Sequence, residues 1–179
     1  MKRIKNIIRY LYVYLWNSFI CHLPSYTIRY YILKYCYRAR LGNCTIHRNV
    51  KFFSPWKLKV GDNTNIQFGS FIDCRGGISI GNNVDITLGV RILSQYHDIQ
   101  CPNYSTLSKM VIIDDYCVIG SYAVILPGSI LNTGTVIGAG SLMNKESEEY
   151  SLYCGNPAIF KKKRYSRLTY NPLYKRPFH

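Results

Sequence analysis

An isoleucine, valine or leucine, and once a methionine, recurs at every sixth position through most of this chain. The unbroken sets are Val60, Ile66, Ile72 and Ile78; Ile80, Ile86 and Ile92; and Ile113, Ile119, Ile125, Leu131, Ile137 and Met143. A period of six matches neither an α-helix, with about 3.6 residues per turn, nor an exposed strand, with about two. It is typical of a repeat solenoid built from short strands, so we expect a mainly β fold.

The spacing of these anchor residues also predicts the size of each coil. In the first part of the chain a shift of two positions, as from Ile78 to Ile80, follows every third repeat, so each coil holds three repeats and this short extension. From Ile113 the spacing of six is uninterrupted, which gives shorter coils of three repeats without the extension. The largest break is residues 98–110, which contain Pro102 and which we expect to leave the coil as a loop.

Residues 1–40 have a different pattern, which predicts helices. Their apolar residues follow helical spacing up to Pro24, where the segment breaks. The segment also contains eight tyrosines and Trp16. Two interpretations stay open: a cap over the open end of the solenoid, which such folds need, and an anchor with aromatic and basic residues at the level of lipid headgroups.

The charge of the chain is strongly positive and concentrated at its two ends. There are 23 Lys and Arg against 9 Asp and Glu, a formal net charge of +14. Residues 1–40 and 161–179 carry basic residues and no acid. No nucleic-acid-binding motif accompanies this charge, so we expect no nucleic-acid partner. Phosphates of another kind, or an anionic membrane surface, explain the basic ends as well.

Cysteine usage and the N-terminus predict a cytoplasmic protein. The seven cysteines form no closely spaced pair, which indicates free thiols in a reducing compartment. The first apolar run is interrupted by Arg9 and Asn17, lacks the form of a signal peptide, and is too short and polar to span a membrane. A place at the inner face of the membrane follows if the helical segment contacts lipid.

We therefore divide the chain into three parts. Residues 1–40 form the helical cap or membrane-interface segment, residues 41–150 form the solenoid domain with the loop 98–110, and residues 151–179 form a basic C-terminal tail.

Several short strings, in their order and spacing, carry a resemblance to a known family. They are Asp73-Cys74-Arg75-Gly76-Gly77-Ile78, Ile80-Gly81-Asn82-Asn83-Val84, His97-Asp98, Ile119-Gly120-Ser121, Ile125-Leu126-Pro127-Gly128, Gly138-Ala139-Gly140-Ser141 and Gly155-Asn156-Pro157-Ala158. Over about residues 42–164 they resemble the hexapeptide-repeat acyltransferases. The branch that O-acetylates bacterial surface polysaccharides matches best, and the maltose and galactoside acetyltransferases are also similar. The resemblance implies a left-handed parallel β-helix, an exception to the usual right-handed crossover.

His97 stands where the repeat stops, at the position that holds the catalytic base in this family. Transfer of an acyl group from a thioester to an alcohol needs a base with a pKa near neutrality, and histidine supplies one. The resemblance therefore implies that His97 is the general base. Adjacent residues of an extended chain point to opposite sides, so we expect Asp98 to shape the loop, and the group that orients His97 is unassigned.

The resemblance also implies acetyl-CoA as the co-substrate, bound in a groove between neighbouring subunits of a homotrimer. Backbone groups at Ser121 and Ala139 would contact the pantetheine arm and the thioester carbonyl. Asn144, Lys145 and Lys162 fall where the family contacts the nucleotide end, and lysines suit its phosphates. For each lysine the alternative is a solvated basic tail.

Two departures limit what can be transferred from the family. Val118 stands where a tryptophan is common, and the residues near Gly69 and Arg75 do not match those that hold the acceptor in the galactoside enzymes. Asp73 and Arg75 remain candidates for contact with the acceptor. The alternative is that Arg75, with the two glycines after it, is only a corner of the coil.

The resemblance implies, and we therefore expect, an O-acetyltransferase for a sugar hydroxyl of a surface polysaccharide or its lipid-linked precursor. The alternatives are a small-molecule acceptor, such as an antibiotic, a free sugar or serine, and a non-catalytic solenoid that binds partners. A metal-dependent protein of the carbonic anhydrase type needs three converging imidazoles, and the solenoid region contains only His47 and His97. We therefore expect no metal.

Overall fold

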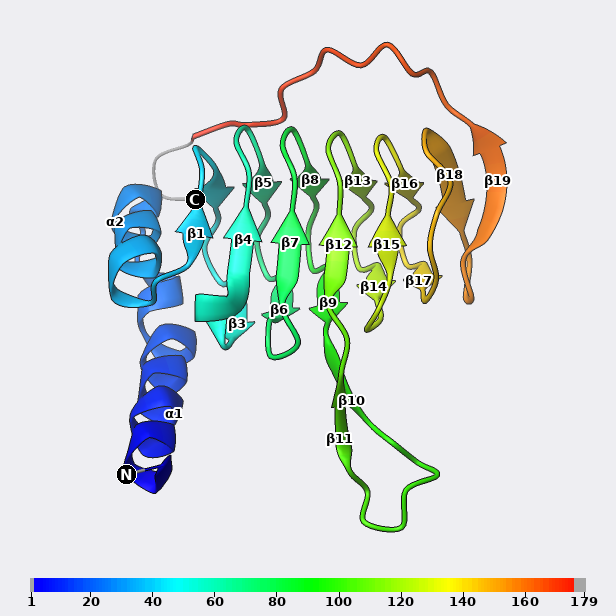
Figure 1. Cartoon of the computed structure of the whole chain (residues 1–179). Coiled ribbons are helices and arrows are strands. Elements are labelled where there is room, and N and C mark those ends of the chain that lie inside the picture. Colours follow the sequence, from blue (N-terminus) through cyan, green and yellow to red (C-terminus); the bar gives the residue numbers. More distant parts are fainter. Residues whose placement is uncertain (1, 176–179) are drawn as a thin grey trace.

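The six-residue period folds into a parallel β-solenoid of about six turns, with a helical segment at its N-terminal end (Figure 1). The structure, a computed structural model, describes residues 2–175. Sheet A contains β1 (Arg40–Leu41), β4 (Leu58–Val60), β7 (Ile78–Ile80), β12 (Val111–Ile113) and β15 (Ile130–Leu131). Sheet B contains β2 (Thr45–Ile46), β5 (Asn65–Ile66), β8 (Asp85–Ile86), β13 (Val118–Ile119), β16 (Val136–Ile137), β18 (Ser151–Cys154) and β19 (Ile159–Lys163). Sheet C contains β3 (Lys51–Phe53), β6 (Phe71–Asp73), β9 (Arg91–Leu93), β14 (Val124–Ile125) and β17 (Leu142–Met143).

The anchor residues point into the coil and form its core. Ile66, Ile86, Ile119 and Ile137 follow one another along sheet B, and each is 0% exposed. The small or β-branched residues at the fifth position of each repeat, such as Ala123, are also buried. Because the strands of the coil are short, one buried apolar side chain from each two-residue strand, and two from strands such as β7 in sheet A, fill the interior. The mainly β solenoid and the N-terminal helical segment predicted from the sequence are both confirmed.

The strand register reproduces the predicted difference between longer and shorter coils. In sheet B, Thr45 pairs with Asn65 and Asn65 pairs with Asp85, so each of these coils holds three repeats and the short extension. Val118 pairs with Val136, a step of three repeats without the extension. The spacing of anchors along the sequence therefore sets the length of each coil.

The corner between sheets A and B is held by side chains that bond to the backbone of the neighbouring coil. The backbone N–H of Asp62 donates to Asn82 Oδ1 at 2.8 Å, and the N–H of Asn82 donates to Asp115 Oδ1 at 2.6 Å. A Cβ on Gly61 would lie 2.5 Å from Asn82 Oδ1, so a glycine is required at that position. These contacts add to the backbone hydrogen bonds between successive coils at this corner, such as that from the N–H of Asn83 to the carbonyl of Asp62 at 2.9 Å.

The helical segment covers the first coil. It contains α1 (Lys2–Ser18), η1 (Ile20–His22), α2 (Tyr26–Tyr31) and the π-helical turn η2 (Ile32–Cys36), and a further short helix, η3 (Pro55–Lys57), precedes β4. Trp16 is buried and its Nε1–H donates to the carbonyl of Val50 at 2.9 Å. The buried Arg29 donates to the carbonyl of Ile46 at 3.1 Å. The open end of the core is thus packed against helix. Within residues 2–175 no helix combines the length and the apolar character needed to cross a bilayer.

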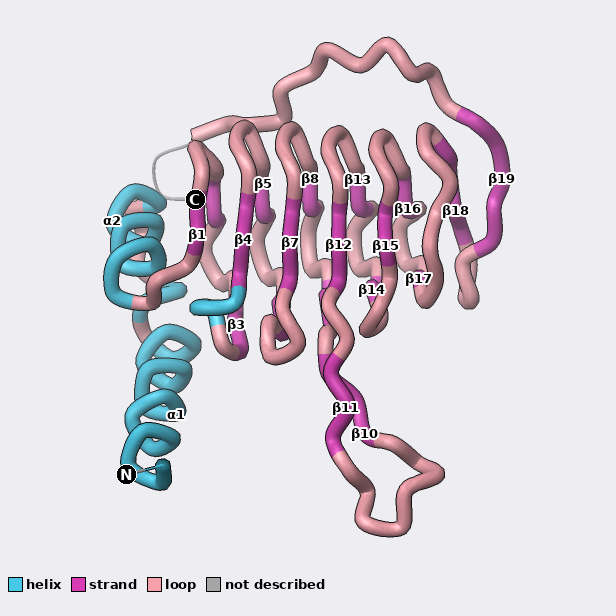
Figure 2. Tube along the Cα trace, viewed as in Figure 1, coloured by secondary structure: helices cyan, strands magenta, loops and turns pink. Residues whose placement is uncertain are grey.

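The break in the repeat, where we expected the loop 98–110, contains regular secondary structure. The chain leaves the coil after β9 as an antiparallel hairpin of β10 (Gln95–His97) and β11 (Thr106–Ser108) (Figure 2). His97 pairs with Thr106 in this hairpin. The strands of a two-stranded hairpin need no buried face with a six-residue period. The anchor pattern therefore could not reveal them.

The boundary of the predicted tail at residue 151 is wrong. Residues 151–154 form the last parallel strand of sheet B, and β19 pairs with it in antiparallel orientation. The chain then returns along the solenoid toward its N-terminal end (Figure 1). On this path Tyr170 Oη–H donates to the carbonyl of Tyr116 at 2.7 Å, and Lys175 Nζ donates to Asn43 Oδ1 at 3.0 Å. Residues 176–179 of the predicted tail lie outside the described residues.

We predict that Ile119→Ala lowers the free energy of unfolding by roughly 2–5 kcal/mol, because it opens a cavity in the centre of the core. The adjacent Val118 faces outward on the same strand, so Val118→Ala serves as the matched control and should cost less than about 1 kcal/mol. Urea unfolding followed by circular dichroism measures both. Equal losses for the two variants would contradict the assigned inside and outside of the coil.

Candidate active site

His97 lies exposed on the hairpin, and a hydrogen bond fixes which ring nitrogen carries the proton. Its Nδ1 is 3.0 Å from the backbone carbonyl oxygen of Tyr104, and its ring stacks on the Tyr104 ring with centroids 4.3 Å apart and planes 5° from parallel. A carbonyl oxygen can only accept, so Nδ1 is the donor in the neutral ring. Nε2 then keeps its lone pair, as a general base requires.

The hairpin tip is shaped to hold Tyr104 in this position. Tyr104 has a φ of 48°, in the left-handed region that a non-glycine residue seldom adopts. The N–H of Asp98 donates to the carbonyl of Ser105 at 2.8 Å, and Asp98 Oδ1 accepts from the N–H of Gln100 at 2.9 Å. Asp98 thus has the loop-shaping contacts expected for it. The sequence could not indicate Tyr104 as the orienting residue, because the group that it contributes is a backbone carbonyl.

Ser121 and Ala139 occupy equivalent positions at the corner between sheets B and C in successive coils. The N–H of Gly140 donates to the carbonyl of Ser121 at 2.9 Å, which ties the two corners together. Ser121 Oγ lies 3.2 Å from the hydroxyl of Thr87 in the coil before. The structure therefore brings these two predicted residues side by side.

The three residues expected at the nucleotide end lie on the last coils. Asn144 and Lys145 are exposed just after β17, and Lys145 Nζ lies 5.7 Å from the centre of the Tyr153 ring. Lys162 is exposed on β19, opposite Leu152. All three are open to solvent and available to an anion.

Within a single chain, His97 lies apart from Ser121 and Ala139. The hairpin with His97 leaves the coil after a strand of sheet C, whereas Ser121 precedes the next strand of that sheet, β14. The two therefore lie at opposite ends of the sheet C strands. In Figure 1 the hairpin extends away from the solenoid body.

Asp73, which is buried, and Arg75, which is partly exposed, form an ion pair at the corner between sheets C and A. Arg75 Nε donates to Asp73 Oδ1 at 2.8 Å and Nη2 donates to Oδ2 at 2.7 Å, and these hydrogen bonds raise the pKa of Arg75. The Asp73 side chain is 2% exposed and that of Arg75 is 45% exposed. The carboxylate is thus occupied by Arg75, while the far side of the guanidinium stays open to solvent.

The buried thiols are poor candidates for chemistry. All seven cysteines are free, and burial raises the pKa of Cys44 and of Cys117 to about 12, so both stay protonated near neutral pH. In the described part of the chain, no three His, Cys, Asp or Glu side chains are grouped so as to hold a metal ion.

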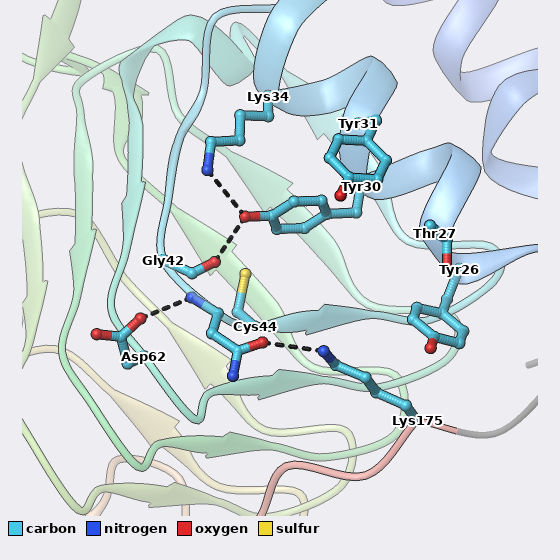
Figure 3. A pocket seen from close by; sticks show the side chains of 10 residues that line it. Tyr26, Thr27, Tyr30, Tyr31, Lys34, Gly42, Cys44, Asp62 and Lys175 are labelled. Carbon is cyan, nitrogen blue, oxygen red and sulfur yellow. Dashed lines mark hydrogen bonds between the residues drawn. The ribbon is translucent and has the colours of Figure 1, made fainter.

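Two of the pockets in the described part of the chain lie where α1 and α2 meet the solenoid. The larger, about 580 Å³, lies between α2, the corner between sheets A and B, and Lys175 (Figure 3). Its polar groups largely bond to one another: Lys34 Nζ donates to Tyr30 Oη at 3.1 Å, and Tyr30 Oη–H donates to the carbonyl of Gly42 at 3.0 Å. The smaller, about 390 Å³, lies between α1 and the corner that carries Arg75, and Gln95 of β10 lines it. Of the two, the smaller pocket adjoins the strand that carries His97.

Solved structures share this fold, whereas no protein-family model and no curated protein matches the sequence. A hexapeptide-repeat acetyltransferase, VCA0836 from Vibrio cholerae, superposes with a TM-score of 0.79 at 20% identity, over 89% of this chain and 92% of that one. A galactoside acetyltransferase solved with coenzyme A gives 0.78 at 24% identity, over 90% and 81%. A maltose O-acetyltransferase from Clostridium difficile 630 gives 0.74 at 24% identity, over 89% and 86%. At these identities the likeness establishes that the chain has the fold of the hexapeptide-repeat acetyltransferases.

Proposed function

We propose that this protein is an O-acetyltransferase that transfers an acetyl group from acetyl-CoA to a sugar hydroxyl, with His97 as the general base. The observation that carries the proposal is the hydrogen bond from His97 Nδ1 to the Tyr104 carbonyl, which leaves Nε2 free to accept a proton on an exposed hairpin. The fold supports it, since VCA0836 was also solved with acetyl coenzyme A and the galactoside enzyme with coenzyme A. The proposed reaction uses no metal.

In the proposed reaction, His97 Nε2 takes the proton of the acceptor hydroxyl while the hydroxyl oxygen attacks the thioester carbonyl carbon. The C–S bond of the tetrahedral intermediate then breaks, and His97 returns the proton to the departing thiolate, which gives the acetyl ester and CoA. Backbone N–H groups at the corners of Ser121 and Ala139 would stabilise the negative charge on the intermediate oxygen. A base of this kind contributes about 10²–10⁴-fold to the rate.

We further propose that the active unit is a homotrimer with the donor bound between neighbouring subunits. The support is geometric, because His97 and the Ser121 corner lie at opposite ends of sheet C and a second copy can bring them together. Asn144, Lys145 and Lys162 would then contact the phosphates at the nucleotide end of the donor.

The proposed acceptor is a surface polysaccharide or its lipid-linked precursor. We propose that the protein acts on it at the membrane surface. Apolar side chains along α1 are half or more exposed, among them Ile4, Ile7, Ile8 and Leu11. An apolar helix face next to basic residues suits a peripheral contact with anionic lipid.

Replacement of the base tests the chemistry directly. We expect His97→Ala to lower the rate of acetyl transfer by about 100-fold or more, with unchanged affinity for CoA, because only the proton acceptor is removed. The matched control is His22→Ala, which removes an exposed histidine of η1 and should keep the wild-type rate. A near-normal rate of acetyl transfer by His97→Ala would contradict the assignment of His97 as the base.

Sedimentation velocity tests the assembly. We expect a single species with the mass of three chains, and loss of acetyl transfer upon dilution into monomer, because the donor site needs two copies. A stable monomer with full activity would rule out the shared groove.

Co-sedimentation with phosphatidylglycerol vesicles tests the membrane contact. We expect binding that falls as salt is raised, and that is weakened by the double variant Ile8→Ser and Leu11→Ser. The control variant, Ile99→Ser and Ile159→Ser, removes exposed isoleucines outside α1 and should bind like the wild type. Absence of binding at low salt would leave α1 only its contacts with the first coil.

A further inference from the structure

The pocket between α1 and the solenoid gathers basic side chains from three separate parts of the sequence. Arg9 comes from α1, Lys57 from η3 and Arg75 from the corner after β6. Its volume of about 390 Å³ is in the range of small-molecule sites. None of the described side chains that line it is a carboxylate.

Two of these three cations lack an acidic partner. Arg75 is paired with Asp73, but within residues 2–175 neither Arg9 nor Lys57 lies within ion-pair distance of a carboxylate. Lys57 Nζ donates to the backbone carbonyl of Arg75 at 2.6 Å, which holds the ammonium group against the corner that carries Arg75. Cations collected in this way repel one another, and an anion with several oxygen acceptors relieves that repulsion.

The same pocket has an aromatic wall. Phe53, Trp56 and Tyr10 line it, and the Arg9 guanidinium lies 5.5 Å from the centre of the Trp56 ring. The Arg75 guanidinium lies 5.1 Å from the centre of the Phe53 ring. Aromatic rings present large apolar surfaces, against which the apolar face of a sugar ring can pack. Cations next to aromatic rings therefore fit a ligand with an anionic group on a ring of carbons.

The pocket also reaches the strand that carries the proposed base. Gln95 lines it and is two residues before His97 on β10. Alternate residues of a strand point to the same face, and two residues span about 7 Å. The side chains of Gln95 and His97 thus face the same side of the hairpin, close enough for one ligand to reach both.

We propose that this pocket binds the phosphate of a phosphorylated sugar acceptor, with the phosphate on Arg9, Lys57 and Arg75 and the sugar ring against Trp56. The proposal rests on the proposed function and narrows its acceptor to sugars that carry a phosphate or diphosphate. The neutral acceptor of a galactoside or maltose enzyme would gain nothing from these cations.

The test is calorimetric binding of glucose 1-phosphate, inorganic phosphate and glucose to the full chain. We expect glucose 1-phosphate to bind more tightly than either fragment, and the double variant Arg9→Gln and Lys57→Gln to weaken its binding at least about tenfold, because two charge-assisted contacts are lost. The matched control is Arg40→Gln with Lys59→Gln. These two residues are register partners on the outer face of sheet A, both are exposed, and their replacement removes the same charge.

Equal weakening by the control variant, or no binding of glucose 1-phosphate and phosphate to the wild type, would overturn the proposal. Trp56→Ala separates the two parts of the site, since it should abolish the advantage of glucose 1-phosphate over inorganic phosphate. Phosphatidylglycerol vesicles distinguish the source of the phosphate. If Arg9→Gln with Lys57→Gln weakens vesicle binding and leaves glucose 1-phosphate binding unchanged, these cations serve the membrane contact and the acceptor assignment is wrong.

Failure of this inference is distinguishable from failure of the proposed function. If glucose 1-phosphate binds through Arg9 and Lys57 but no acetyl group is transferred from acetyl-CoA to any sugar, the phosphate site is supported and the proposed enzymatic function is overturned. Acetyl transfer that requires His97 but proceeds equally well to neutral and phosphorylated sugars, and is unchanged in Arg9→Gln with Lys57→Gln, overturns the site and supports the enzyme.

Discussion

The stacking of apolar side chains in columns inside the coil is the constraint on which the rest of this structure depends. Along sheet B, Ile66, Ile86, Ile119 and Ile137 lie one above the other and are fully buried, although their strands are only two residues long. Such short strands have little hydrogen bonding of their own, so the continuous column of side chains supplies much of the stabilisation. Polar side chains buried in the coil, such as Thr64, Asn65 and Ser70, are hydrogen-bonded to the neighbouring coil, so they support the stack and are not free for chemistry.

The break in the repeat is a hairpin, and the proposed base, His97, lies on it. On the first coil, His47 is 2% exposed and its Nε2 lies 2.8 Å from Asn65 Oδ1, so that ring is enclosed within the fold. On β10, His97 is carried out into solvent, and the Tyr104 carbonyl and ring hold its orientation. In the proposed reaction the corners of Ser121 and Ala139 contribute backbone groups instead of side chains. Every residue type supplies the same backbone carbonyl, and all but proline supply an N–H. A functional backbone group therefore cannot be recognised from the residue type at its position.

The excess of basic residues acquires a more specific meaning in three dimensions. Much of the C-terminal segment is not a free tail, because it returns along the solenoid and Lys175 reaches Asn43 in the first coil. At the N-terminal end, Arg9 converges with Lys57 and Arg75 in one pocket although they are far apart in the sequence. Local concentration of charge, more than its total, is what selects an anionic ligand.

The residue pattern alone was enough to predict the solenoid, its longer and shorter coils and the place where the coil is interrupted, because a buried column needs an apolar residue at each fixed step and so leaves a periodic record. It also singled out His97, since the histidine stands at that interruption. The folded chain was needed to show that the interruption is a hairpin, that Tyr104 orients His97, that residues 151–154 belong to the last coil and that Asp73 is occupied by Arg75. Each of these depends on hydrogen bonds and ion pairs between groups brought together by the fold. Such contacts have no period, and the residues that make them are marked by nothing in the chain until it is coiled.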